Sequence, residues 1–177
     1  AADIPRFERL IQHHKDLFGS NPVQLFSTPG RTEIGGNHTD HNNGRVLAAA
    51  IDLDSIAVAA PNNMDKIVVY SEGYDRPFET DISRLDPVRE EEGSSAALIR
   101  GIAGSLRQKN HGIGGFSACV TSEVLPGSGL SSSASFEVLI GTIVNYLFNN
   151  GRIVPDLIAK TSQYAENTYF GKPCGLM

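Results

Sequence analysis

The sequence is poor in the residues that build disulfide, zinc and nucleic-acid sites. Its 177 residues include no tryptophan, two cysteines, and 15 lysines and arginines against 20 aspartates and glutamates. Cys119 and Cys174 are too few for a disulfide framework and match no zinc spacing, so we expect both to be reduced thiols. A net charge of −5 with no basic block is not the electrostatic footprint of a protein that binds polyanions. We therefore expect no nucleic-acid partner.

Long apolar runs are missing as well. The most apolar stretch, residues 46–60, is interrupted by Asp52 and Asp54, whereas a membrane-spanning helix needs ~20 apolar residues. The first five residues show no basic segment followed by the apolar segment of a secretory signal. We expect no membrane partner and a cytoplasmic location. The hydrophobic content of 40% is sufficient for a folded core.

The pattern of apolar residues predicts an α+β fold, with a largely antiparallel sheet and helices packed on it. Helical spacing indicates helices over residues 4–18, 96–109 and 155–170, and in the segment that includes 136–148. Asp3 is expected to cap the first helix and Gly19 to end it. Strand-like segments separated by turn residues occupy 23–26, 45–51, 55–60, 66–70 and 116–121. The last of these alternates as a half-buried strand does.

A glycine- and serine-rich loop, residues 126–135, lies between the last predicted strand and an apolar helix. Glycines let the backbone approach an anion, and the first turn of a helix offers unpaired N–H groups and the positive end of the helix dipole. Serine hydroxyls add donors to phosphate oxygens. The loop has neither the lysine of a Walker A loop nor the spacing of a dinucleotide fingerprint. It indicates either a phosphate-binding loop of another kind or an ordinary helix-capping turn.

A second polar cluster occupies residues 29–42, where one arginine, two carboxylates, two histidines and two asparagines share a glycine-punctuated turn. Such side chains can hydrogen-bond the hydroxyls of a sugar. A solvated loop is one alternative. A metal pair of His38 and His41 is another, although no spaced third and fourth ligands accompany it. Taken alone, the cluster does not choose between a loop and a binding site.

Together, the two segments resemble the galactokinases of the GHMP small-molecule kinase family. Residues 29–40 resemble the galactokinase signature, residues 126–135 the family's phosphate loop, and residues 165–177 the stretch that runs into the catalytic aspartate. The resemblance covers essentially the whole chain. It implies the N-terminal domain of the GHMP fold over residues 1–177, with a mixed sheet and packed helices of the ribosomal protein S5 domain 2 type.

The resemblance further implies ATP-dependent phosphorylation of galactose at its anomeric hydroxyl, with ATP and Mg²⁺ as cofactors. By position, Ser133 and Glu166 would hold the metal, and Ser71 would lie near the adenine. Arg31 would stand between the transferred phosphoryl group and the catalytic base, where a fixed positive charge stabilises both. The phosphates would be wrapped by Gly127, Ser128, Gly129, Leu130, Ser131, Ser132 and Ser133. The sugar would be contacted by Asn37, His38, Thr39, Asp40 and Gly175.

Two departures from the family pattern matter. Asn37 stands where the family usually has glutamate and Glu33 where it usually has asparagine, which leaves the exact hexose open. The family's catalytic aspartate directly follows the pattern that ends here at Met177. The resemblance therefore implies that the C-terminal part of the same kinase completes the site. The 177 residues alone are expected to be inactive or nearly so, because a positioned base contributes ~10²–10⁴ in rate.

Two other functions remain open at this point. A sensor of the galactokinase type would bind sugar and ATP without chemistry, and a residue other than aspartate after Met177 would favour it. A GHMP kinase for another small alcohol, such as mevalonate or homoserine, would not need the sugar-suited side chains of residues 37–40.

Overall fold

The structure of the protein is a computed structural model that describes residues 3–36 and 44–176. Within these residues, helices and strands follow one another in an α+β arrangement, as predicted. In chain order the elements are α1 (Ile4–Phe18), β1 (Gln24–Gly35), β2 (Leu47–Pro61), β3 (Lys66–Ser71), β4 (Phe78–Asp81), the 3₁₀ turn η2 (Arg89–Glu91), α2 (Ser95–Gln108), β5 (Phe116–Ser122), α3 (Ser132–Asn149), α4 (Pro155–Ala165) and the π-helical turn η3 (Glu166–Phe170).

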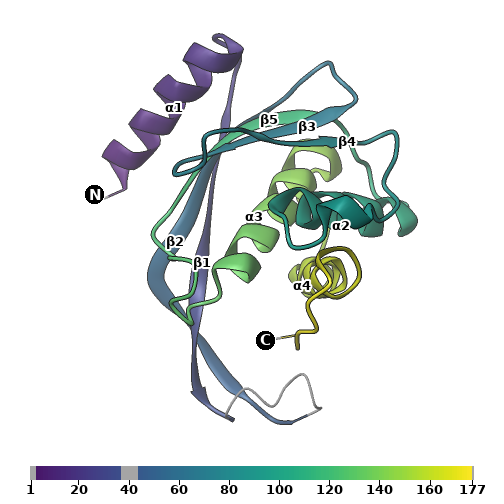
Figure 1. Ribbon diagram of the computed structural model, residues 1–177. Helices are drawn as coiled ribbons and strands as arrows, with labels where there is room; N and C mark the ends of the chain where they lie inside the picture. Colours follow the sequence, from purple (N-terminus) through teal and green to yellow (C-terminus); the bar gives the residue numbers. More distant parts are fainter. Residues whose placement is uncertain (1–2, 37–43, 177) are drawn as a thin grey trace.

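The strands form one mixed sheet in the order β1-β2-β5-β3-β4 (Figure 1). The pairs β1–β2, β2–β5 and β3–β4 run antiparallel, and β3 and β5 run parallel. Parallel neighbours need a crossover connection, which α2 supplies between β3 and β5. The prediction of a largely antiparallel sheet within a mixed α+β fold is confirmed.

Helices cover both faces of this sheet (Figure 1). On one face α1 packs over a small apolar cluster of Leu10, Ile56, Val58 and Cys119. On the other face α2, α3 and α4 enclose the main core. The strand β5 lies between the two cores and is buried throughout residues 116–121. The prediction of a half-buried strand is therefore wrong, because its alternating side chains enter two cores rather than one core and water.

The strands β1 and β2 are longer than predicted. Pro29 was expected to mark a turn, but it lies inside β1 and pairs with Asp54 of β2. The register shifts between Pro29 and Arg31, and β1 is an edge strand, where a proline is tolerated. The two predicted strands at 45–51 and 55–60 are one continuous strand, β2. The short edge strand β4 was not predicted.

The ends of α1 are correct as predicted, but its N-terminal cap is not. Asp3 has helical backbone angles and makes no side-chain cap; its carboxylate instead accepts a hydrogen bond from Arg6 Nη1 at 3.1 Å. Gly19 ends the helix with φ of 83°, and its N–H donates to the Lys15 carbonyl. A salt bridge to Arg6 thus replaces the expected cap.

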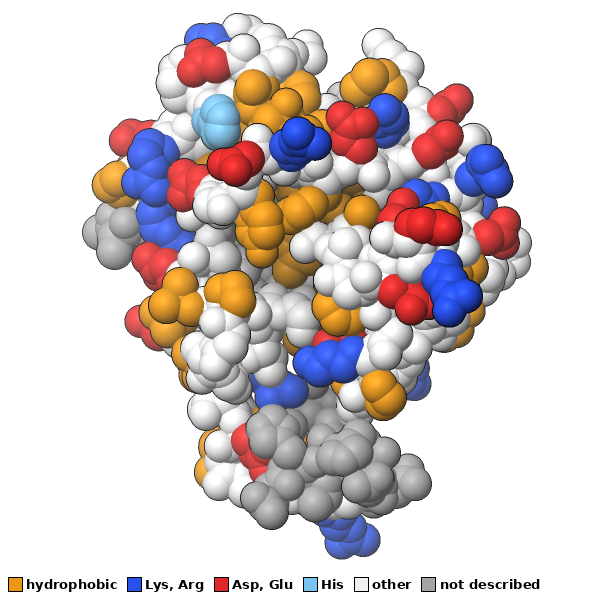
Figure 2. All heavy atoms as spheres, in the orientation of Figure 1, with side chains coloured by type: hydrophobic (Ala, Val, Ile, Leu, Met, Phe, Trp, Pro, Cys, Tyr) orange, Lys and Arg blue, Asp and Glu red, His pale blue; other side chains and the backbone are white. Residues whose placement is uncertain are grey.

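The predicted helix over 155–170 changes its hydrogen-bonding pattern near its end. Its last turn, from Glu166 to Phe170, is π-helical, and Gly171 terminates it with φ of 82°. π-helical turns occur often at functional sites. None of the helices in the described ranges is both long and apolar enough to cross a membrane. The face shown in Figure 2 carries charged side chains of both signs around a central group of apolar ones.

Candidate active site

The glycine- and serine-rich loop lies between β5 and α3, as predicted, and its backbone is specialised. Gly127 and Gly129 have φ of 76° and 77°, and Ser131, which directly precedes α3, has φ of 60°. The two glycines adopt this left-handed conformation without steric cost. The loop thus delivers the chain to the start of α3, where the helix offers N–H groups without intrahelical partners and a favourable dipole for an anion.

This loop packs closely onto the edge strand at Gly30. A β-carbon at Gly30 would stand 2.9 Å from Val124 Cγ2 and 3.0 Å from the Leu130 carbonyl oxygen. The N–H of Arg31 donates to that same carbonyl at 3.1 Å. The Pro-Gly-Arg segment therefore has a physical role of its own: its glycine leaves room for the loop, and the next residue binds the loop's backbone.

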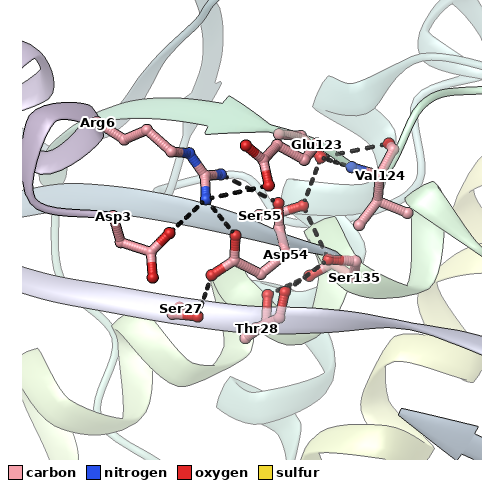
Figure 3. Close-up of polar contacts among 10 residues, drawn as sticks. Asp3, Arg6, Ser27, Thr28, Asp54, Ser55, Glu123, Val124 and Ser135 are labelled. Atoms are coloured by element: carbon pink, nitrogen blue, oxygen red, sulfur yellow. Dashed lines mark hydrogen bonds and ion pairs between the residues drawn. The ribbon is translucent and has the colours of Figure 1, made fainter. Parts of the chain in front are cut away.

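A chain of hydroxyl groups, buried at Thr28, Ser55 and Ser135, holds the start of α3 against the sheet (Figure 3). Ser135, in the first turn of α3, donates to the Thr28 carbonyl of β1 at 3.0 Å and receives a hydrogen bond from the Thr28 hydroxyl to its own carbonyl at 2.9 Å. Its Oγ also lies 2.8 Å from Ser55 Oγ of β2, which lies 2.8 Å from Ser122 Oγ of β5. Ser122 in turn accepts from the N–H of Val124 at 3.1 Å.

An ion-pair cluster extends this network to α1 (Figure 3). Arg6 Nη1 lies 2.7 Å from Asp54 Oδ1 of β2 and 3.5 Å from the Glu123 carboxylate. Ser27 of β1 donates to the second oxygen of Asp54 at 2.6 Å. The N–H of Glu123 donates to the Asp54 carbonyl at 2.9 Å. Both ends of the loop are therefore fixed by residues from four different elements, so the loop is preorganised.

The residues near the start of α3 border a first cavity of about 280 Å³, which we call the carboxylate cavity. It brings together predicted site residues that are far apart in the sequence: Arg31 from β1, Ser131 from the loop, Glu166 from η3, and Gly175. Its lining also includes Glu137 of α3 and Ser162 of α4, which sequence reasoning missed. Glu137 left one signal in the sequence, since it is a carboxylate within the apolar helix of residues 136–148.

Three side chains of this cavity have buried polar atoms that find no hydrogen-bond partner in the described part of the chain. They are Arg31, at Nε and Nη1, Glu137, at Oε1, and Ser162, at Oγ. A buried polar group without a partner typically costs 1–3 kcal/mol, so native proteins keep few of them. Their gathering around one cavity indicates a place for water or for a polar ligand.

Glu137 is 1% exposed. Burial, and next the nearby Glu166, raise the pKa of Glu137 to about 9, against the weaker opposing effect of Lys172. The side chain is therefore a neutral carboxylic acid at pH 7. A neutral acid can donate a hydrogen bond as well as accept one.

The predicted metal pair meets in the structure. Ser133 Oγ, in the first turn of α3, donates to Glu166 Oε1 at 3.2 Å, and Lys172 Nζ lies 3.5 Å from the same oxygen. Glu166 is 5% exposed. Among the residues described, no three His, Cys, Asp or Glu side chains gather into a complete metal site. Two oxygen donors nevertheless suit Mg²⁺, which usually takes one or two protein ligands and fills its octahedron with water and phosphate oxygens.

A second, larger cavity of about 540 Å³ lies beside the same loop, and we call it the aromatic cavity. Ser71, at the end of β3, lines it, as do Pro126 and Ser132 of the loop. Its aromatic lining comes from Tyr74, Phe78 and Phe136. Ser71, predicted to lie near adenine, is thus next to a cavity that also reaches the predicted phosphate loop.

Of the predicted site residues that the structure describes, five line neither cavity: Gly127, Ser128, Gly129, Leu130 and Ser133. Asn37, His38, Thr39 and Asp40 lie outside the described residues. The hydroxyl of Ser128 donates to the Leu125 carbonyl at 2.6 Å and accepts from the Leu130 N–H at 3.3 Å, so it stabilises its own loop. The two cysteines are both free, as predicted, and Cys119 is buried in the small cluster under α1.

Two family descriptions match the chain. The galactokinase galactose-binding signature matches residues 12–61, which include β1, and the GHMP kinases N terminal domain matches residues 97–177, which include the loop and α3. These ranges cover the segments that contribute Arg31, Ser131, Glu166 and Gly175 to the carboxylate cavity.

Individual proteins are similar over nearly the whole chain. A galactokinase of Clostridium acetobutylicum is 32% identical over 169 residues, which are 95% of this chain and 43% of that protein. The crystal structure of Lactococcus lactis galactokinase complexed with galactose is 28% identical, with a TM-score of 0.88 over 97% of this chain and 44% of that one. The mevalonate kinase of Methanococcus jannaschii, 22% identical with a TM-score of 0.70 over 86% of this chain and 49% of its own, shares the fold. The chain thus spans less than half the length of these relatives.

Proposed function

Because the chain belongs to the GHMP kinase family, we propose that it forms the N-terminal part of a galactokinase, which transfers a phosphoryl group from ATP to the anomeric hydroxyl of galactose. One observation carries this proposal. Residues from the galactose-binding signature, from the phosphate loop and from the segment around Glu166 line one cavity, in which several buried polar groups lack partners among the described residues.

Arg31 is the residue that we place at the transferred phosphoryl group. Its guanidinium is always charged, and two of its donor nitrogens find no acceptor in the described structure. The transition state of phosphoryl transfer spreads negative charge over the equatorial oxygens, which a planar, multidentate donor stabilises. The Arg31 backbone is held by the loop at Leu130, so the side chain starts from a fixed position.

Different parts of the nucleotide are proposed to bind at the loop and in the aromatic cavity. We propose that the phosphates bind the loop of residues 127–133 and the start of α3, and that the nucleoside occupies the aromatic cavity beside Ser71. Mg²⁺ would be held by Ser133 and Glu166, and when bound it would neutralise phosphate charge. Lys172 would then exchange its ion pair with Glu166 for a contact with the phosphates.

The sugar is proposed to bind Asn37, His38, Thr39, Asp40 and Gly175. Gly175 lines the carboxylate cavity, which supports its place near the reacting groups. The base that accepts the sugar proton would be an aspartate directly after Met177, as the family pattern implies. The C-terminal part of the same kinase is the partner that we expect to complete the sugar site.

Two other functions compete with this proposal. A sensor would use the same cavities for ATP and galactose without transfer. A kinase for another small alcohol is suggested by the fold that mevalonate kinases share. The match to the galactose-binding signature over residues 12–61 favours galactose over the other alcohols.

A transfer assay with the native protein tests the proposal. The protein is incubated with radiolabelled ATP and separately with galactose, glucose, mevalonate or homoserine, and binding of ATP and galactose is measured by calorimetry. We expect label in galactose, with phosphorus NMR placing it on the anomeric oxygen. Binding of both ligands without transfer would identify a sensor, and label in mevalonate or homoserine alone would overturn the choice of substrate.

A further inference from the structure

One wall of the aromatic cavity is a row of three rings. Tyr74 packs edge-on against Phe78, with ring centroids 4.9 Å apart and ring planes at 70°. Phe78 in turn packs edge-on against Phe136 of α3, at 6.3 Å and 80°. Phe78 and Phe136 are partly buried against the main core, whereas Tyr74 is 56% exposed. The row therefore runs from the core to the open side of the cavity and ends in an exposed ring.

Backbone hydrogen bonds, in addition to the aromatic contacts, fix the position of Tyr74. The N–H of Glu72 donates to the Val120 carbonyl at 2.9 Å, which continues the pairing of β3 with β5. Gly73 then turns with φ of 91°, and the N–H of Tyr74 donates to the Ser71 carbonyl at 3.2 Å. A tight turn thus fixes the backbone position from which the exposed ring extends.

The charges of the aromatic cavity indicate which end of a nucleotide lies at Tyr74. Glu72 is the one charged side chain among the described residues that line this cavity, and it neighbours Tyr74. Glu72 forms an exposed ion pair with Arg9 at 3.7 Å, so the described residues on this side of the cavity present no free positive charge to phosphate groups. The loop residues Pro126 and Ser132, by contrast, border the same cavity beside the helix start that favours phosphates. The phosphates therefore belong at the loop, and the nucleobase belongs at the aromatic wall.

We propose that Tyr74 is the stacking surface for the nucleobase and so determines the affinity of the nucleoside part, an inference that rests on the proposed use of a nucleotide. An exposed aromatic face offers a base a large apolar contact area, and a ring already held edge-on by Phe78 loses little freedom when a ligand stacks on it. Phe78 contributes by packing against Tyr74, and Phe136 by packing against Phe78.

Binding measurements with base-containing and base-free ligands test this inference. Tyr74→Ala and Tyr74→Phe are compared with wild type for ATP and for inorganic tripolyphosphate by calorimetry, in the native protein. Tyr146→Ala is the matched control, because Tyr146 is 55% exposed and lines neither cavity. We expect Tyr74→Ala to weaken ATP binding by roughly 5- to 30-fold, with Tyr74→Phe close to wild type. Tripolyphosphate affinity should not change in any variant.

A second measurement needs no substitution. Nitration of exposed tyrosines, followed by mass spectrometry, should show that ATP protects Tyr74 and leaves Tyr146 reactive, while tripolyphosphate protects neither. If wild type binds ATP and Tyr74→Ala binds it equally well, or if ATP leaves Tyr74 fully reactive, the inference is overturned while the proposed function stands. If wild type binds neither ATP nor tripolyphosphate, the proposed function fails and the inference fails with it.

Discussion

The two cavities beside the start of α3 are lined by side chains of different chemical character. Consecutive residues of one short segment serve both: Ser131 and Glu137 line the carboxylate cavity, and Ser132 and Phe136 line the aromatic cavity. The carboxylate cavity presents charged and polar groups that lack partners among the described residues. The aromatic cavity presents rings and hydroxyl groups around a single described carboxylate.

This difference supports the proposed division of tasks between the two cavities. Buried polar groups without hydrogen-bond partners destabilise the free protein, but they can stabilise the charge of a bound ligand. The carboxylate cavity therefore suits the reacting groups. Aromatic rings pack favourably against any flat ligand surface, and they cost little free energy when no ligand covers them. The aromatic cavity therefore suits binding without chemistry. Substitutions in the two cavities should therefore affect different kinetic constants.

The largest effect is expected at Arg31. Replacing Arg31 with alanine should lower kcat by roughly 10²–10³-fold, because an electrostatic donor to the transition state is lost, and should leave the Kd of ATP nearly unchanged. The measurement is steady-state kinetics together with ATP calorimetry, both with the native protein. Arg152→Ala is the control, since Arg152 is an exposed arginine that lines neither cavity. A wild-type kcat in Arg31→Ala would contradict the assignment of chemistry to the carboxylate cavity.

The next effect concerns stability at Glu137. Its pKa of about 9 in the folded protein exceeds the ordinary value of 4.5, so folding binds a proton between these pH values. The stability that the neutral acid contributes is full below pH 4.5 and is lost as pH rises towards 9. The loss has a slope of at most about 1.4 kcal/mol per pH unit.

Glu137→Gln removes this titration. The free energy of unfolding in urea is measured at pH 5.5 and pH 8.5, which are about one unit and four units above the ordinary pKa of a glutamate. We expect wild type to lose stability relative to Glu137→Gln as pH rises. Glu8→Gln, at an exposed carboxylate, is the control and should follow wild type. If the free energy of unfolding changes with pH equally in wild type and Glu137→Gln, Glu137 is already ionised near neutral pH. The carboxylate cavity would then lack the neutral buried acid that distinguishes it from the aromatic cavity.

The smallest effect is expected at Ser71. Ser71→Ala removes one hydroxyl from the aromatic cavity and should weaken ATP binding by about 2- to 10-fold, as the loss of one hydrogen bond does, while kcat stays near wild type. Calorimetry and steady-state kinetics measure the two constants. Ser20→Ala, at an exposed serine outside both cavities, should leave both unchanged. A fall in kcat without a change in Kd would place Ser71 with the reacting groups.

Features that depend on local sequence could be predicted well. The helix over residues 4–18 has the bounds that its apolar spacing indicated, and the loop of 126–135 lies between a strand and a helix as expected. The hydrophobic pattern and the turn residues decide such elements within a few positions of the chain. The resemblance implied roles for Arg31, Ser133 and Glu166, which stay predictions, and the structure brings Ser133 and Glu166 into contact.

Features that depend on neighbours in space could not be predicted in the same way. Pro29 looked like a break, but its strand continues because it lies at the edge of the sheet. Asp3 is predicted from the sequence to cap α1, but its carboxylate accepts a hydrogen bond from Arg6 instead. Glu137 was not singled out in the sequence, and its burial beside Glu166 became visible only once α3, α4 and β1 enclosed a cavity.

The sequence by itself therefore indicated the helices, most of the strands and the glycine- and serine-rich loop, together with the resemblance from which the chemistry is proposed, because these follow from local patterns and from matching motifs. Only the tertiary structure decided that Gly30 makes room for Leu130, that Ser135 bonds Thr28, and that two cavities of different character share one helix start. Contacts between residues about a hundred positions apart depend on how the sheet and helices pack, and no local pattern records that packing.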